Sequence, residues 1–127
     1  MYNLDLTSEI PLYQQIVDQT KVAIASSYFY EGDKLPSIRD MAKTLMVNQS
    51  TVSKAYRELE SSGFIKTVPG KGTFISFDER KIELEKENMA EKLMEVFRES
   101  LVFSFTKKEI ESLYDEVLKE EELWSYM

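Results

Sequence analysis

Short polar side chains fill most of residues 48–54, and their donor and acceptor groups are of the kind that bind nucleic acid. Gln and Asn amides can bind the edge of adenine with two hydrogen bonds, and Ser and Thr hydroxyls bind phosphates or bases. Because the run begins a predicted helix, free backbone N–H groups there would also favour phosphate. Polar residues start many helices simply as caps, so the run alone leaves both interpretations open. The candidate residues are Asn48, Gln49, Ser50, Thr51, Ser53 and Lys54.

Basic residues flank this run on both sides in the sequence. Arg39 lies in the first turn of the preceding predicted helix, where a charged side chain can reach a nucleic-acid backbone. Lys66 and Lys71 bracket a turn that contains Gly70 and Gly72, and such a hairpin could press into a minor groove or onto phosphates. A hairpin whose lysines serve only for solubility would have the same composition. The hairpin therefore indicates nucleic-acid binding only in combination with the polar run and Arg39.

Three predicted helices must position these side chains. The first begins near Pro11, because the missing N–H of proline is tolerated in a first helical turn. Ser37 can cap a short second helix, and Asn48 can cap a third helix that runs to about Ser62. Gly63 then stands where a glycine commonly ends a helix. Each helix has apolar residues at helical spacing, which predicts one buried face.

The hydrophobic period changes after the third helix. Residues 64–68 and 73–77 are rich in β-branched and aromatic side chains, which favour strands. Pro69-Gly70-Lys71-Gly72 between them can adopt positive φ at low cost and predicts a β-hairpin. Helix, short helix, helix and hairpin form the order of a winged helix-turn-helix.

The last 50 residues are predicted to form two charged helices that share an apolar stripe. Ser104-Phe105 ends the first of them, and Thr106 with Glu109 forms a capping box for the second. Two helices cannot bury both sides of such a stripe by themselves, so we expect a second copy of the chain to cover it. The predicted dimer contacts are Leu93, Val96, Phe97, Leu101, Ile110, Leu113, Tyr114, Val117 and Leu118, and the stripe continues to Trp124.

Two other interpretations of these helices stay open at this point. The tail could fold back onto residues 1–77 and cover its stripe there. The acidic side chains spaced along the first tail helix could hold a metal ion, although a solvated helix face has the same pattern. Those side chains are Glu83, Glu87, Glu91 and Glu95.

Charge is distributed unevenly along the chain. The net charge is −7, yet residues 1–77 hold eight basic and eight acidic residues. Residues 78–127 hold eight basic and fifteen acidic residues, so all of the net acidity lies in the tail. Within the first part, residues 34–73 hold seven basic and only three acidic residues. A locally basic segment beside an acidic one suits a chain with one surface for a polyanion and another that faces away from it.

The composition excludes several classes of function. Without Cys or His, the 127-residue chain can form no disulfide, no zinc site of those ligands and no His-based catalytic triad. The glycine turn lacks the earlier glycine and the following Ser or Thr of a phosphate-binding loop, and no paired carboxylates suggest catalysis. We therefore expect a protein that is not an enzyme and needs no cofactor. No apolar run reaches the ~18 residues of a membrane span and no signal-peptide pattern is present, so we expect a cytoplasmic protein.

Four motifs follow one another between residues 11 and 76: PLYQQI, EGDKLPSIRDMA, VNQSTVSKAYRELESSGFI and GKGTFI. Their order and spacing resemble the DNA-binding domain of the GntR family of bacterial transcription regulators. The resemblance implies DNA contacts from Arg39, from the start of the third helix at residues 48–53, and from Gly70 with Lys71. We add Lys34, Ser37 and Gly72, which lie within or beside the same motifs, to the candidate DNA-binding residues.

This chain also departs from the family pattern. Many members have Arg where this chain has Gln49, and some have Arg at Ser53, so an Arg–guanine contact is not expected from those positions. Ser27-Tyr28 replaces the usual small residue and glycine before the next turn. The 50-residue tail is too short for the large effector or aminotransferase-like domains of other subfamilies. It resembles the small YtrA-type subfamily, in which two helices form the dimer.

The sequence thus predicts a mainly α protein with a small β-hairpin. Residues 1–77 would form a winged helix-turn-helix DNA-binding domain, and residues 78–127 a helical dimerisation tail. The resemblance implies a homodimeric repressor that binds a two-fold symmetric double-stranded DNA operator in its own operon and that of an adjacent transporter. The alternative is a winged-helix protein-interaction module that no longer binds DNA. No metal or membrane partner is expected, and the sequence leaves open whether a small-molecule effector binds.

Overall fold

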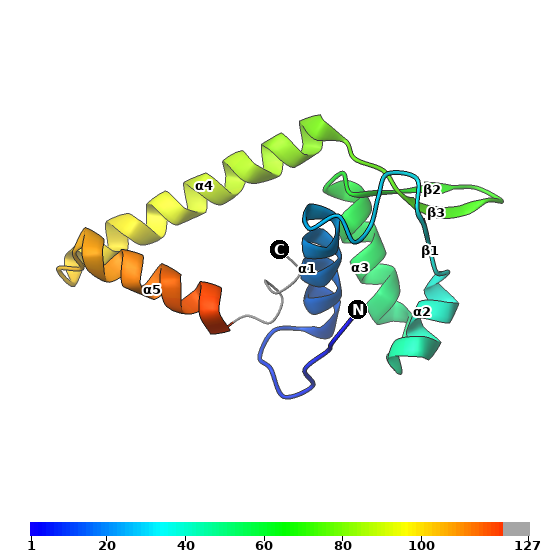
Figure 1. Ribbon diagram of the computed structural model, residues 1–127, viewed down its shortest axis with the longest axis horizontal. Helices are drawn as coiled ribbons and strands as arrows, with labels where there is room; N and C mark the ends of the chain where they lie inside the picture. The colour runs from blue at the N-terminus through cyan, green and yellow to red at the C-terminus, as the bar shows by residue number, and fades with distance from the viewer. Residues whose placement is uncertain (121–127) are drawn as a thin grey trace.

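Five helices and three short strands make up residues 1–120, which are the part of the chain that the computed structural model describes (Figure 1). The predicted mainly α fold with a winged helix-turn-helix is confirmed, and Trp124 lies outside the described residues. The elements are α1 (Leu12–Ala25), β1 (Lys34–Leu35), α2 (Ile38–Leu45), α3 (Gln49–Ser61), β2 (Ile65–Val68), β3 (Gly72–Ile75), α4 (Glu79–Val102) and α5 (Lys107–Glu120).

One hydrophobic core joins α1, α2, α3 and the strands. Its centre is formed by Ile16 of α1, Val52 and Leu59 of α3, and Ile75 of β3, all of which are fully buried. Helix α3 packs against α1, α2 and β2, so it is the central element of this region. We call residues 12–75 the winged region.

The sheet has three strands rather than the two of the predicted hairpin. The strand order is β1-β3-β2, and β1 pairs antiparallel with β3 through Lys34 opposite Phe74 and Leu35 opposite Thr73. A two-residue strand has no hydrophobic period of its own, and its partner lies about forty residues away in the sequence. The extended Leu35 before Pro36 was predictable; the pairing that makes it a strand was not.

Most predicted helix ends are confirmed, and one is not. The Ser37 Oγ accepts a hydrogen bond from the Asp40 N–H at 3.1 Å and caps α2. Thr106 and Glu109 form the predicted capping box before α5. Asn48 stands at the cap position of α3, but its side chain makes no capping hydrogen bond, which leaves the amide exposed. This prediction was right about position and wrong about the bond.

The turn between α2 and α3 contains a strained residue. Met46 has φ 56° and ψ 47°, which is the left-handed conformation, and its side chain is 90% exposed. A Cβ costs energy in this conformation, whereas glycine adopts it freely. The exposed side chain offsets little of this cost through packing.

We expect Met46→Gly to raise the free energy of unfolding by about 1 kcal/mol, because it removes this strain and little contact. Chemical denaturation at fixed protein concentration measures the change. Glu58→Gly is the control: Glu58 is exposed within α3, where glycine should destabilise by about 1 kcal/mol. Equal destabilisation by both substitutions would show that Met46 carries no strain.

The first ten residues are held along α1 by two glutamine side chains. Gln19 accepts from the Asn3 N–H at 2.7 Å and donates to the Asn3 carbonyl at 2.8 Å. Gln15 accepts from the Asp5 N–H and donates to the Asp5 and Ile10 carbonyls. The Tyr2 hydroxyl lies 2.6 Å from Thr20 Oγ1, and burial raises the pKa of Tyr2 to about 12. Both glutamines are buried, and their side chains satisfy backbone groups of the first ten residues. Their polarity gives no sign of this burial in the sequence.

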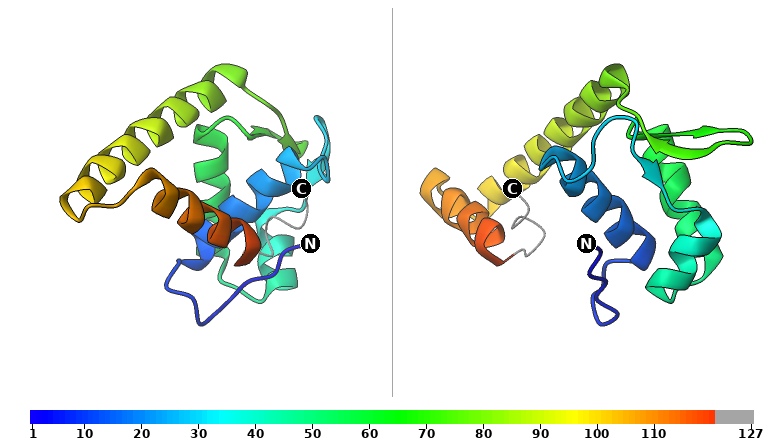
Figure 2. Two further views of the ribbon diagram at one scale, coloured as in Figure 1. Left: turned by 60° about the vertical axis from the view of Figure 1, so that its left-hand side comes forward. Right: turned by 45° about the vertical axis from the view of Figure 1, so that its right-hand side comes forward.

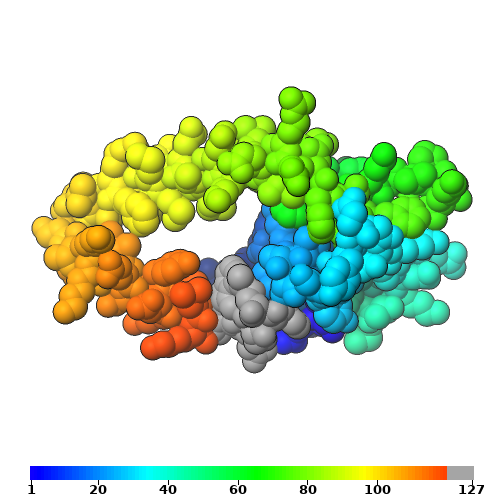
Figure 3. Space-filling view, turned by 45° about the horizontal axis from the view of Figure 1, so that its top comes forward, coloured from blue at the N-terminus to red at the C-terminus, as the bar shows by residue number. Residues whose placement is uncertain are grey.

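Helix α4 projects from the winged region, and α5 turns back from its far end without packing onto that region (Figures 1 and 2). At the root of α4, the Asp78 N–H donates to the Gly63 carbonyl at 2.8 Å. A Cβ on Gly63 would lie 2.6 Å from Lys81 Cβ, so only glycine lets the two segments approach this closely. Figure 3 shows open space between α4 and α1. Within residues 1–120, no helix combines the length and apolar composition that a membrane crossing requires.

Candidate nucleic-acid interface

Helix α3 has one apolar face and one polar face. Val52, Ala55, Tyr56 and Leu59 point into the core and are buried. The polar residues predicted for DNA contact lie on the other sides of the helix, where Thr51 and Ser53 are half-buried and the rest are exposed. The exposed ones are Asn48, Gln49, Ser50 and Lys54.

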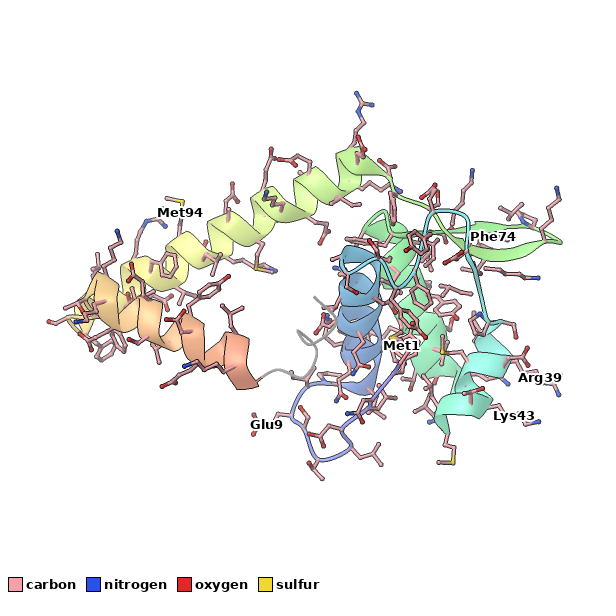
Figure 4. The ribbon with its side chains drawn as sticks, in the orientation of Figure 1. Met1, Glu9, Arg39, Lys43, Phe74 and Met94 are labelled. Atoms are coloured by element: carbon pink, nitrogen blue, oxygen red, sulfur yellow. The ribbon has the colours of Figure 1, made fainter. Side chains whose placement is uncertain are left out.

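A buried tyrosine fixes the position of α2 relative to α3. The Tyr56 hydroxyl donates to the Pro36 carbonyl at 2.7 Å, and burial raises the pKa of this phenol. The carbonyl immediately precedes Ser37, the cap of α2, so the bond holds the start of α2 against the middle of α3. Arg39 in the first turn of α2 is exposed and points away from the core (Figure 4). Arg39 thus lies in the first turn of α2, where the sequence predicted it, and its side chain is exposed.

The wing is a tight turn anchored to the end of α3. Pro69 and Gly70, with φ 75° at the glycine, form the turn, which the Lys71 N–H closes by donating to the Val68 carbonyl at 3.0 Å. The Glu60 Oε1 accepts from the Thr67 N–H at 2.9 Å and joins β2 to α3. Gly70 and Lys71 are exposed at the tip, remote from the start of α3 (Figure 1).

Lys34 lies next to the wing because it belongs to β1, the strand that pairs with β3. Its partner in β3 is Phe74, and its side chain lies across Gly72, where an added Cβ would come within 2.8 Å of Lys34 Cε. Gly72 therefore makes room for the Lys34 stem. Lys34 therefore lies close to Lys71 and Gly72, although it is far from both in the sequence.

Beside Lys54 lie two residues that were not among the predicted DNA contacts, Tyr13 of α1 and Arg57 of α3. The Lys54 Nζ lies over the Tyr13 ring of α1, 4.0 Å from the ring centroid. Arg57, one turn further along α3, is exposed. Together with Lys54 and Tyr13, it borders an open pocket whose other lining residues are Pro11, Leu12, Ser50 and Thr51. The spacing of Ser50, Lys54 and Arg57 on one helix face was visible in the sequence, but the contribution of α1 was not.

The tail helices carry a second candidate surface. No residue of α4 is buried, although the helix holds many large apolar side chains. The residues predicted for dimer contact are exposed, apart from the half-buried Ile110. These exposed residues are Leu93, Val96, Phe97, Leu101, Leu113, Tyr114, Val117 and Leu118. The winged region therefore does not cover them.

No cluster of three or more acidic side chains suited to a metal ion is found between residues 1 and 120. The exposed acidic residues of α4 form a solvated face in this structure. Two candidate surfaces thus stand out among the described residues, which are the polar side of the winged region and the apolar stripe of the tail helices.

Comparison with known proteins agrees with this geometry. Residues 12–75 match the family model described as bacterial regulatory proteins, gntR family. A curated relative is the HTH-type transcriptional repressor YtrA of Bacillus subtilis, which is 41% identical over 101 residues, or 80% of this chain and 73% of the relative.

Two solved structures are also similar. YtrA from Sulfolobus acidocaldarius, a GntR-family transcription factor, is 38% identical with a TM-score of 0.55, covering 93% of this chain and 97% of that one. The DNA-binding domain of AraR in complex with operator ORE1 is 25% identical with a TM-score of 0.51, covering 60% of this chain and 93% of that one. From the family match and these relatives, the chain belongs to the GntR family and is a transcriptional regulator with a winged helix-turn-helix, not an enzyme.

Proposed function

We propose that the protein is a homodimeric repressor that binds a two-fold symmetric DNA operator. In this proposal residues 1–77 bind DNA and residues 78–127 join two copies. The observation that carries it is the exposed apolar stripe of α4 and α5, attached to a winged region in which the polar face of α3, the recognition helix of the helix-turn-helix, is uncovered. A soluble chain seldom leaves so much apolar surface in water, and such patches mark interaction sites.

A second copy of the chain is the occupant that best fits the stripe. Two-fold symmetry would place the same helices of both copies against each other and present two recognition helices to two half-sites. The half-sites would be separated by ~10 base pairs or a multiple of that distance. The repressor role is supported by the similarity to YtrA, a named repressor. Control of its own operon and of an adjacent transporter is the part of the proposal that comes from the family resemblance alone.

Within each half-site, the exposed amides of Asn48 and Gln49 at the start of α3 would read bases, and the hydroxyls and cations around them would bind phosphates. Gln49 can bind adenine, and Arg39 would bind the DNA backbone beside the groove. Lys34, Lys71 and the glycine turn would bring the wing to the neighbouring backbone or minor groove.

A mobility-shift assay with the DNA upstream of the protein's own gene tests this function. Tight binding that survives excess random-sequence competitor would support it, and an in vivo reporter fused to that DNA should be derepressed when the gene is deleted. If the protein bound neither that DNA nor random duplex at low salt, the alternative of a protein-interaction module would replace the proposal.

Arg39→Ala should weaken binding to every duplex by about 1–3 kcal/mol, since it removes a charge-assisted phosphate contact and no base contact. Titration of operator and random-sequence duplexes measures the change. Both affinities should fall by a similar factor. If only operator binding fell, Arg39 would be reading a base instead.

A further inference from the structure

An open pocket between the start of α1 and the exposed face of α3 has two cations on its border. Lys54 and Arg57 come from α3, and Tyr13 comes from the first turn of α1. Resting on the proposed function, we propose that this pocket binds a backbone phosphate of the DNA strand opposite to the one that the wing contacts. Tyr13 would act as a positioning residue that orients Lys54.

The first argument is the position of the pocket relative to the wing. Glu60 bonds to Thr67 and so marks the side of α3 that faces the wing. Lys54 meets Tyr13 and marks the side that faces α1. A helix in the major groove has a phosphate backbone on each flank. If the wing approaches one backbone, the Tyr13 side of α3 approaches the other.

The second argument is the chemistry of the lining. Two positive side chains and the hydroxyls of Ser50 and Thr51 are suited to phosphate oxygens. Among residues 1–119, whose side chains the structure describes, no carboxylate forms an ion pair with Lys54 or Arg57. Their charges are available to an external anion.

The third argument concerns Tyr13. A lysine ammonium has a flexible four-carbon stem, and immobilising it on binding costs conformational entropy. The aromatic face of Tyr13 attracts the ammonium at 4.0 Å from the ring centroid and restricts it before DNA arrives. Gln15 supports this arrangement because it donates to the Ile10 carbonyl and so fixes the chain just before α1.

The salt dependence of DNA binding tests the proposal with the full-length protein. Each lost phosphate contact lowers the slope of log affinity against log salt by about 0.9, or about eightfold in affinity at 0.1 M salt relative to 1 M. Lys54→Ala and Arg57→Ala should each lower the slope on random-sequence and operator duplexes alike. Tyr13→Leu should weaken binding to both duplexes, whereas Tyr13→Phe should retain wild-type binding because it keeps the ring.

Lys21→Ala is the matched control. Lys21 also lies over an aromatic ring, that of Phe64 at 5.0 Å, but it does not line the pocket. Its removal should leave the slope unchanged. Ethylation interference on the operator should show one phosphate in each half-site whose modification weakens wild-type binding but not that of Lys54→Ala.

The outcomes separate this inference from the function on which it rests. If Lys54→Ala and Arg57→Ala bound DNA like the wild type, with unchanged salt slopes, the phosphate site would be refuted. The proposed function as a DNA-binding regulator would not be affected. Loss of base preference without a change of slope would make Lys54 a base reader and also overturn it. Absence of any DNA binding by the wild-type protein would instead refute the proposed function. Circular dichroism at the assay temperature should show that every variant is folded.

Discussion

Leu113→Asp combined with Val117→Asp should convert the protein to a monomer and weaken operator binding by about 100-fold or more. Both side chains belong to the exposed stripe of α5, where Leu113 is 48% and Val117 is 44% exposed in the single chain. In the proposed dimer they would be covered, so two new carboxylates would be buried without partners. The large effect on binding follows because two linked winged regions bind cooperatively, whereas one makes few phosphate contacts.

Sedimentation velocity measures the assembly, and titration of the operator duplex measures the affinity. The control is Ser112→Asp combined with Lys119→Gln, which changes the net charge by the same amount on the other face of α5. This control should remain a dimer and lose much less affinity. If the stripe variant stayed dimeric with normal operator binding, the tail would not be the dimer interface.

The winged region was predictable because its signals are local. Ser37 as a cap, Gly63 at the end of α3 and the Pro69-Gly70 turn are each determined by neighbouring residues, and the structure confirms all three. The apolar residues of α3 at helical spacing also gave the correct buried face. Local chemistry and helical periodicity were therefore sufficient for the order of the three helices and the hairpin, but not for β1.

The missed features depend on contacts between segments far apart in the sequence. Strand β1 exists because Lys34 and Leu35 pair with β3, and Gln15 is buried because it satisfies the backbone of the first ten residues. Composition gives no hint of either, since a two-residue strand has no period and glutamine is usually exposed. Asn48 shows the converse: a residue suited to capping leaves its side chain free.

The candidate DNA-binding site also has a part that local sequence predicts and a part that depends on packing between distant segments. Arg39 and the polar residues at the start of α3 were predicted from their place on the helices, and the structure leaves them accessible. The contribution of Tyr13 required the packing of α1 against α3, which no single segment specifies. Contact with DNA by any of these residues remains a prediction.

Leu59→Ala should have the largest effect on stability, about 2–5 kcal/mol, because it leaves a cavity at the centre of the core. Leu59 is fully buried on α3, the helix that packs against α1, α2 and β2. For a domain of this size, 1 kcal/mol corresponds to roughly 4–8 °C in Tm, so the midpoint should fall by about 10 °C or more. Thermal and urea denaturation at one protein concentration give both numbers.

Leu6→Ala is the matched control, since it removes the same atoms from a side chain that is 80% exposed. It should change stability by less than about 0.5 kcal/mol. Leu59 does not lie on the polar side of α3, so the variant should bind operator with nearly wild-type affinity at a temperature where it is folded. Loss of binding by the folded variant would mean that core packing also determines how α3 meets DNA. An unchanged Tm would contradict the central place of Leu59 in the core.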